Sequence, residues 1–278
     1  MKVSRQFRIG SVLVGRGAPL FLIAGPCVIE NSRHCRAMAE KIKSVTAEVG
    51  IPFIFKASFD KANRSSIKSY RGPGLSEGLE ILGSIREDFD VPVLTDIHEV
   101  SQISAVTKVV DCVQIPAFLS RQTDLLLAAG LGSSSVNVKK GQFLSPWDME
   151  HVLEKIASTG CDRILLTERG TSFGYNNLIV DIRSFAVMRE FGYPVVYDVT
   201  HSLQQPGGQG SRSGGQPQFI EYLARAGVAA GVDGLFMELH DNPEAALSDG
   251  ANALELCQLE PLLRQLVMIN KIVKENEP

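Results

Sequence analysis

The sequence has no long hydrophobic run and no excess of positive charge. Its longest apolar stretches are about five to eight residues, whereas a helix needs roughly 20 to span a bilayer. The chain opens with Met1-Lys2-Val3 rather than an apolar signal region, so we expect a cytoplasmic protein with no membrane partner. The formal net charge of −3 gives no field that attracts nucleic acid, and we expect no such partner. Any anionic ligand must therefore be held by cations placed locally.

Cysteine is scarce, and the five residues present show no CxxC spacing. An odd, scattered set argues against a disulfide framework and against a structural zinc knuckle. We expect four of them to be reduced residues of the core or of helices: Cys35, Cys112, Cys161 and Cys257. Cys27 differs because it directly follows Gly25-Pro26, where an apolar run stops. It is either a small buried hydrophobic residue or a ligand at the end of a strand.

Eight short aliphatic and β-branched runs recur along the chain, and segments with helical periodicity separate most of them. The runs cover residues 20–25, 52–58, 91–96, 111–116, 135–140, 163–169, 194–200 and 233–239. Buried strands that alternate with helices are typical of a parallel sheet, and eight such units predict a (β/α)8 TIM barrel of the α/β class. A doubly wound open sheet is the alternative, but no GxGxxG motif follows the first run. We expect a single barrel domain over residues 1–278.

Two segments carry signals of their own. Residues 6–19 alternate differently from the other runs and contain glycines at a turn, which predicts an N-terminal β-hairpin that plugs the N-terminal end of the barrel. In residues 145–160, Ser145 is expected to cap a helix, with Pro146 at its first position and Gly160 just past its end.

Residues 201–219 are rich in Gly, Ser and Gln and lack any periodic apolar pattern. They predict a long loop, and such loops in compact domains are often functional. Because the segment starts at His201 and carries Arg212, we interpret it as a mobile lid that closes over charged substrates. A passive surface loop is the alternative.

Polar side chains follow every predicted strand. In a barrel of this kind the active site lies at the C-terminal ends of the strands, so these side chains are expected to meet at one mouth. Five cations form a first set: Lys56, Lys61, Arg64, Lys139 and Arg169. Cations so close together repel one another unless anionic ligands neutralise them, so the set predicts a site for several phosphate or carboxylate groups. Any single lysine can instead extend from a strand end into solvent.

A second set combines a thiol, an imidazole and two carboxylates: Cys27, His201, Glu238 and Asp249. These donors suit a divalent transition metal such as zinc, iron or manganese. Spacing alone does not bring the four together, and His98 or His240 are alternative ligands. His34 and His151 lie in predicted helices away from the mouth, and we expect both to be structural.

Five long segments resemble the 3-deoxy-D-manno-octulosonate 8-phosphate synthase family, and the resemblance runs over essentially the whole chain. The segments are FKASFDKANRSS (55–66), IPAFLSRQTDLLLAA (115–129), NVKKGQFLSPWDM (137–149), LTERGTSFGYNNLIVD (166–181) and DVTHSLQQPGG (198–208). The related 3-deoxy-heptulosonate 7-phosphate synthases share the barrel and phosphoenolpyruvate and are the alternative. They have a Lys-Pro-Arg-Thr type of segment where this chain has KANRSS (61–66).

The resemblance implies an aldol-type condensation of phosphoenolpyruvate with D-arabinose 5-phosphate. The products are 3-deoxy-D-manno-octulosonate 8-phosphate and inorganic phosphate, on the route to lipopolysaccharide. Where the motifs match, the resemblance also implies which residues bind each substrate. Phosphoenolpyruvate is held at its phosphate by Lys139 and Arg169, and at its carboxylate and enol region by Lys56, Ser58, Lys61 and Gln114. Arabinose 5-phosphate is held by Asn63, Arg64 and Ser65.

The same resemblance implies further roles. Arg121 reaches the sugar phosphate of a neighbouring subunit, so a homotetramer is expected. Asp96 orients a lysine or a sugar hydroxyl, with capping of the helix after the third strand as its alternative. The residues implied to take part in the chemistry itself are Lys61, Asp96, Lys139, His201 and Asp249.

The family includes metal-dependent and metal-free members, and the metal-free form has asparagine at the position of Cys27. Cys27, His201, Glu238 and Asp249 therefore resemble the metal-dependent class, in which the ion orients or activates water or polarises the sugar carbonyl. Gly250, directly after Asp249, is more similar to the metal-free members. Two other functions stay open: a Schiff-base aldolase with Lys139 as the nucleophile, and a non-catalytic barrel that binds sugar phosphate.

Overall fold

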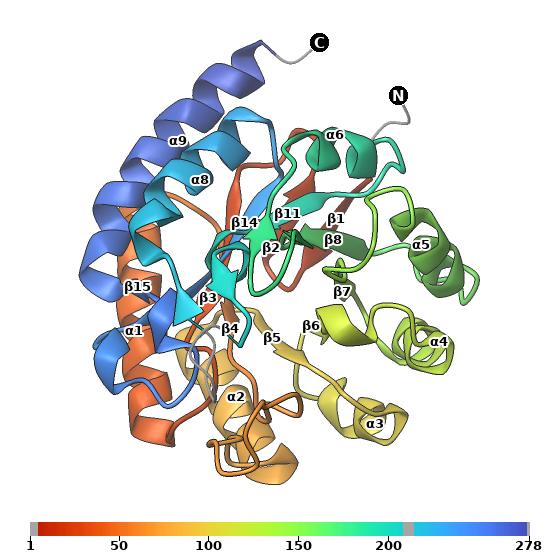
Figure 1. The fold of residues 1–278 in the computed structure, drawn as a ribbon. Helices are drawn as coiled ribbons and strands as arrows, with labels where there is room; N and C mark the ends of the chain where they lie inside the picture. Colours follow the sequence, from red (N-terminus) through yellow and green to blue (C-terminus); the bar gives the residue numbers. More distant parts are fainter. Residues whose placement is uncertain (1–4, 208–213, 277–278) are drawn as a thin grey trace.

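Eight parallel strands form a closed barrel in the computed structural model, which describes residues 5–207 and 214–276 (Figure 1). The barrel strands are β3 (Phe21–Gly25), β4 (Phe53–Lys56), β5 (Val93–Asp96), β6 (Cys112–Ile115), β7 (Val136–Lys139), β8 (Ile164–Glu168), β11 (Val195–Asp198) and β14 (Gly234–His240). Each pairs with the next, and β14 pairs with both β11 and β3, which closes the ring. The predicted (β/α)8 barrel is confirmed, and the open doubly wound sheet is excluded.

Helices surround this barrel on the outside (Figure 1). The described helices are α1 (Ser32–Val49), α2 (Leu75–Phe89), α3 (Ile103–Val106), α4 (Thr123–Gly132), α5 (Met149–Ala157), α6 (Arg183–Arg189), α7 (Val199–Ser202), α8 (Ile220–Ala229) and α9 (Leu259–Glu275). Side chains on the outer face of the strands pack against the helices in one large core, which includes Phe55 and Tyr197. Side chains on the inner face form a separate core, which includes Ile23 and Phe236. This division is typical of strands that are buried on both faces.

An antiparallel hairpin of β1 (Gln6–Ile9) and β2 (Val12–Gly15) precedes the barrel, with Ile9 opposite Val12. Ile9, Val12 and Val14 are buried and belong to the inner core of the barrel. At the turn, Gly10 has a φ of 53° and lies against Pro92, which comes just before β5. The hairpin therefore fills the N-terminal end of the barrel, as the sequence predicts.

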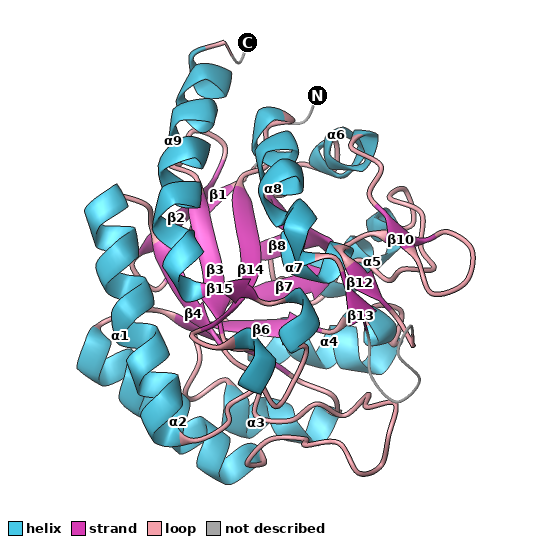
Figure 2. Cartoon of the chain, turned by 60° about the vertical axis from the view of Figure 1, so that its left-hand side comes forward, coloured by secondary structure: helices cyan, strands magenta, loops and turns pink. Residues whose placement is uncertain are grey.

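The segment after β11 is only partly an irregular loop. It begins with the short helix α7, and its two arms then pair as β12 (Gln204–Gln205) and β13 (Gly214–Gly215), which lie near α7 in Figure 2. The expected single loop over 201–219 is therefore wrong at its base. The tip between the arms, with Arg212, lies outside the described residues, so the lid stays a prediction.

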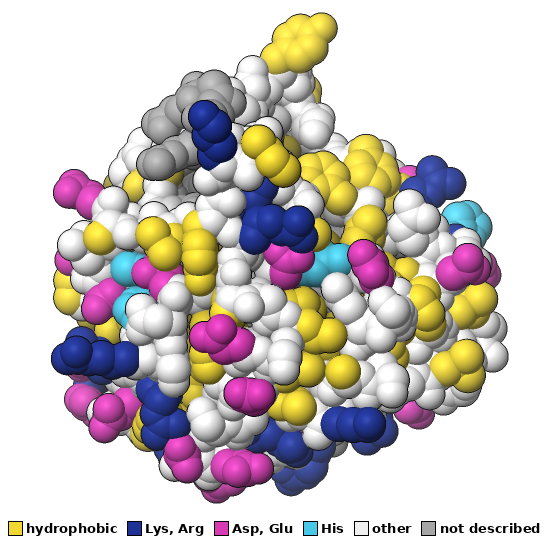
Figure 3. All heavy atoms as spheres, turned by 90° about the horizontal axis from the view of Figure 1, so that it is seen from below, with side chains coloured by type: hydrophobic (Ala, Val, Ile, Leu, Met, Phe, Trp, Pro, Cys, Tyr) yellow, Lys and Arg dark blue, Asp and Glu magenta, His cyan; other side chains and the backbone are white. Residues whose placement is uncertain are grey.

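Three more short strands complete the set of described strands. β9 (Thr171–Ser172) and β10 (Leu178–Ile179) form a second hairpin after β8, and β15 (Leu254–Glu255) adds to the end of β14. Acidic and basic side chains are interspersed over the face seen in Figure 3. Over residues 5–207 and 214–276, no helix is both long and apolar enough to cross a membrane.

Candidate active site

Glu238 lies at the centre of the polar residues gathered at the C-terminal ends of the strands. Its Oε1 is 3.4 Å from Lys56 Nζ, 3.7 Å from Lys61 Nζ and 3.3 Å from His201 Nε2. Burial alone would raise the pKa of this carboxyl, but His201 and the nearby lysines hold it well below its usual range. Its second oxygen, Oε2, is buried and has no hydrogen-bond partner among the described residues. Glu238 is therefore an ionised carboxylate with a free oxygen, which is the state a metal ligand needs.

Cys27 reaches this carboxylate because β3 and β4 approach each other closely. Gly25 has a φ of 158°, and a Cβ on it would lie 2.0 Å from the carbonyl oxygen of Lys56. Two residues later, the buried Cys27 Sγ lies 2.8 Å from Ser248 Oγ. Burial, with Glu238 nearby, raises the pKa of the Cys27 thiol, so a cation is needed to make it a thiolate.

His201 is oriented by Asp198, which caps α7. One oxygen of Asp198 accepts the backbone N–H of His201 at 3.0 Å, and the other lies 2.7 Å from His201 Nδ1. The opposite ring nitrogen, Nε2, therefore faces Glu238 and lies 4.0 Å from Asp249 Oδ2. A carboxylate behind an imidazole is the usual support of a histidine that binds a metal.

Three of the four expected ligands each offer an atom within 4.8 Å of the others: Cys27, Glu238 and Asp249. His201 adjoins this group through its contacts with Glu238 and Asp249. With a thiol, an imidazole and two carboxylates, one of them with a free buried oxygen, the group fits a divalent transition metal. The alternative ligands lie elsewhere, since His98 pairs with Asp96 at 3.0 Å and His240 with Glu30 at 3.2 Å.

Lys139 is buried on β7 in a mixed environment. Its Nζ lies 2.5 Å from Asp198 Oδ2, 3.3 Å from His201 Nδ1 and 3.5 Å from the centre of the Phe236 ring. Burial lowers the pKa of Lys139 to about 8, against the opposing effect of Asp198. An anion bound here would stabilise the charged ammonium.

Arg169 is buried at the end of β8 with one half of its guanidinium unused. Nη2 donates to Gln204 Oε1 at 2.6 Å, whereas the buried Nη1 has no hydrogen-bond partner within the described part of the chain. Gln204 in turn donates to Asp249 at 3.0 Å. The free Nη1 is a donor for an anion such as phosphate.

Asp96 orients side chains on the neighbouring strand. It accepts a hydrogen bond from Ser58, whose hydroxyl lies 3.0 Å from Lys56 Nζ. The helical turn that follows begins at Val100 after Glu99, so Asp96 does not cap it and the capping alternative is wrong. Gln114 lies one strand further along and accepts from Asn137 at 3.0 Å.

The KANRSS segment contributes at the rim of the mouth. Arg64 donates to the Tyr70 carbonyl at 2.9 Å, and its Nη1 lies 3.8 Å from Asp249 Oδ1. Asn63 and Ser65 are exposed beside it. Arg121 is also exposed, just after the turn Ala117–Leu119 that follows β6.

Three residues at the site were given no role from the sequence: Asp198, Gln204 and Ser248. A signal existed for Asp198, because an aspartate three residues before a histidine, directly after a strand, suits a helix cap. Gln204 and Ser248 lie in segments without periodicity, so nothing in the sequence places their side chains.

The comparison with protein families agrees with this geometry. A family model described as the DAHP synthetase I family matches residues 2–275. The chain belongs to the DAHP synthetase I family. Three of its curated relatives carry the name 2-dehydro-3-deoxyphosphooctonate aldolase.

The relatives of this DAHP synthetase I member match over nearly the full length of both chains. The protein of Syntrophotalea carbinolica is 58% identical over 269 residues, covering 97% of each chain. That of Geotalea uraniireducens is 56% identical, covering 97% of this chain and 99% of its own. That of Geobacter sulfurreducens is 54% identical, covering 98% and 100%. The resemblance to the octulosonate branch is thus confirmed.

Proposed function

We propose that this protein condenses phosphoenolpyruvate with D-arabinose 5-phosphate and water. The products are 3-deoxy-D-manno-octulosonate 8-phosphate and inorganic phosphate, in lipopolysaccharide sugar biosynthesis. The name shared by the relatives supports this reaction. The observation that carries it is the cluster of buried cations at one mouth, where Arg169 retains a free donor. Such a cluster is suited to anions that bring their own negative charge into a buried site.

Each substrate has a matching part of the pocket. The phosphoenolpyruvate phosphate binds between Lys139 and the free Nη1 of Arg169, while Lys56, Ser58, Lys61 and Gln114 hold its carboxylate and enol. The sugar phosphate binds at the rim to Arg64, with Asn63 and Ser65. Since the phosphoenolpyruvate site is the more deeply buried, the sugar aldehyde is presented to it from the solvent side.

The chemistry then needs a new carbon–carbon bond, a new carbon–oxygen bond from water, and one broken carbon–oxygen bond. C3 of the enol attacks the sugar aldehyde, whose oxygen takes up a proton, and water adds at C2 with loss of its proton. The resulting tetrahedral centre loses phosphate through cleavage of the C2–O bond. Lys61 stabilises the oxygen that becomes negative, and Asp96 holds Ser58 and Lys56 in place through their hydrogen bonds.

A divalent transition metal, zinc, iron or manganese, is proposed at Cys27, His201, Glu238 and Asp249. When bound, such an ion supplies Lewis acidity that orients or activates water or polarises the aldehyde. The contribution of the chain itself is orientation, because Asp198 fixes the His201 ring and Gln204 ties Asp249 to Arg169. His201 and Asp249 thereby stand beside the reacting carbons.

We further propose a cytoplasmic homotetramer. Arg121 is exposed three residues after Phe118, a phenylalanine that is 55% exposed. An exposed aromatic side chain beside a cation is suited to a contact between subunits. In that arrangement Arg121 supplies a second cation to the sugar phosphate of a neighbour.

One observation favours a second candidate reaction, Schiff-base aldol chemistry at Lys139. Its lowered pKa is a property of a nucleophilic lysine, but its 2.5 Å ion pair with Asp198 keeps the nitrogen protonated. Borohydride with a carbonyl substrate separates the two, since only an imine is trapped. We expect no covalent adduct.

The direct test of the proposed reaction is inorganic phosphate release from the two substrates together. The protein is assayed as purified, after stripping with a strong chelator, and after addition of zinc, iron or manganese. We expect loss of release on stripping and recovery on addition. If phosphate release survives complete stripping, the proposed metal is wrong and the proposed reaction stands. If the substrates bind but no phosphate is released, the non-catalytic barrel is favoured.

A further inference from the structure

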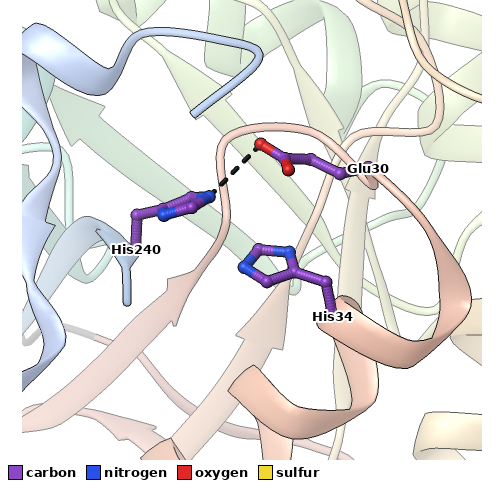
Figure 4. Close-up of side chains that lie close together, drawn as sticks. All are labelled: Glu30, His34 and His240. Carbon is purple, nitrogen blue, oxygen red and sulfur yellow. Dashed lines mark hydrogen bonds and ion pairs between the residues drawn. The ribbon is translucent and has the colours of Figure 1, made fainter. Parts of the chain in front are cut away.

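A second group of metal-binding side chains lies outside the site described above. Glu30 follows β3, His34 lies in the first turn of α1 and His240 ends β14, and the three side chains face one another in Figure 4. Each offers one ligand atom, and these atoms lie within 4.8 Å of one another. None of the three belongs to the Cys27 group.

His34 has one ring nitrogen in use and one without a partner. Its Nε2 lies 3.1 Å from Asp241 Oδ1, while the buried Nδ1 has no hydrogen-bond partner in residues 5–207 and 214–276. A carboxylate at Nε2 holds the proton there, so Nδ1 carries a free lone pair. A buried unpaired acceptor is costly, and a cation at this position would satisfy it.

The spacing of the other two ligands already suits zinc. His240 Nε2 lies 3.2 Å from Glu30 Oε1. Two ligands of a tetrahedral zinc ion, each at 2.0–2.1 Å, are separated by about 3.3 Å. His240 Nδ1 accepts the Asn242 backbone N–H at 2.9 Å and lies 3.2 Å from Asp241 Oδ1. For Nε2 to bind an ion, the ring proton moves from Nε2 to Nδ1, where Asp241 accepts it in place of the contact with Asn242. His34 offers a ligand atom within 4.8 Å of those of the other two residues.

We propose that Glu30, His34 and His240 form a second site for a divalent transition metal of the zinc type, with water as its fourth ligand. Two histidines and one carboxylate are a donor set that zinc accepts in proteins. The site joins the start of α1 to the end of β14. Glu30 Oε1 also accepts the backbone N–H of Leu247 at 2.8 Å, next to Ser248 and Asp249. Metal binding here would fix the segment that carries part of the first site.

The test measures metal stoichiometry and spectra rather than turnover, so its outcome does not depend on the proposed reaction. Stripped protein is loaded with excess Co²⁺, dialysed and analysed for bound metal and for visible absorption. We expect two ions per chain in the unchanged protein. A thiolate-to-cobalt charge-transfer band reports the Cys27 site, because the second site contains no sulfur.

His34→Ala is expected to bind one ion fewer while the thiolate band is retained. His34→Gln serves as a second variant with a side chain of similar volume, and the exposed His151→Ala is the matched control that keeps both ions. Cys27→Ser is expected to lose the thiolate band and to keep one ion at the second site. The double variant Cys27→Ser/His34→Ala is expected to lose that ion as well. A single ion per chain that gives the thiolate band in the unchanged protein would overturn the proposal, as would the same stoichiometry in both His34 variants as in the control.

Discussion

Cys27 is buried against Ser248, Glu238 and Lys56 rather than packed among aliphatic side chains. We predict that Cys27→Asn lowers the bound metal by one ion per chain, because a neutral amide does not replace a thiolate ligand. Metal analysis after dialysis measures this, and the exposed Cys257→Asn is the control. Unchanged metal content in Cys27→Asn would contradict the ligand assignment.

Lys139 combines burial, an ion pair with Asp198 and a place in the expected phosphate site. Replacement by Met is predicted to lower kcat/KM by about 100- to 1,000-fold, or roughly 3–4 kcal/mol, because it removes a preorganised cation. Steady-state phosphate release measures the loss, with the exposed Lys271→Met as control. A near-normal rate would take Lys139 out of the site.

Arg64 lies at the rim, with its guanidinium near Asp249. For Arg64→Ala we predict a larger rise in KM for arabinose 5-phosphate than for phosphoenolpyruvate, because the sugar phosphate is the substrate anion proposed to bind the lost cation. Separate titration of each substrate measures the two values, and Arg71→Ala, whose guanidinium pairs with Asp60, is the control. An equal rise in both KM values would contradict the division of the pocket.

For single residues, the sequence predicts which side chains lie at the mouth better than it predicts which side chains they contact. Cys27 and Glu238 were expected at the mouth because parallel strands bring their C-terminal ends together. His34 was expected to be structural because its helix starts away from the mouth, yet it lies beside Glu30 and His240. Helical periodicity does not reveal contacts across 200 residues of sequence.

Gly250 is a residue whose type has two explanations, a family resemblance and local packing. Its resemblance to metal-free members pointed away from a metal. In the structure a Cβ at this position would lie 2.1 Å from the Pro243 carbonyl oxygen, so packing requires the glycine. Gly250 is therefore no argument against an ion at Asp249.

Gly25 at the end of β3 allows β3 and β4 to approach each other closely. We predict that Gly25→Ala destabilises the fold by several kcal/mol, because the added methyl overlaps the Lys56 carbonyl and strains a positive φ. Thermal and denaturant unfolding measure the change. Gly83→Ala inside α2, whose Cβ would meet its nearest neighbour at 3.5 Å, is the control and should be neutral or stabilising by about 0.5–1 kcal/mol. Equal stability of the two variants would show that β3 can shift.

The predicted strands and helices agree with the structure where hydrophobic periodicity is strong and differ from it at the ends of the elements. All eight barrel strands lie within the predicted runs or one residue beyond them. The helix expected to start after Ser145 begins at Met149 instead. Ser145 and Asp148 bond to each other and close a separate turn, which delays the helix. Local side-chain bonds of this kind compete with a cap, and composition alone does not rank them.

The whole molecule is expected to work as an assembly of identical subunits. If Arg121 serves a neighbouring site, Arg121→Ala and Arg64→Ala chains are each impaired alone but complement each other when co-expressed. A random mixture then restores both arginines at roughly a quarter of the sites. Phosphate release by the purified mixture measures this, and mixing each variant with itself is the control. No gain on mixing would place Arg121 outside its neighbour's site.

The hairpin that fills the base of the barrel closes the N-terminal end of the pocket within the described residues. Ile9, Val12 and Val14 fill the space below the inner core, so both substrates must enter, and both products leave, through the mouth. Phosphoenolpyruvate, whose proposed site is the deeper one, is therefore expected to bind before arabinose 5-phosphate. A hairpin far from any reacting atom thus influences the order in which the two substrates bind.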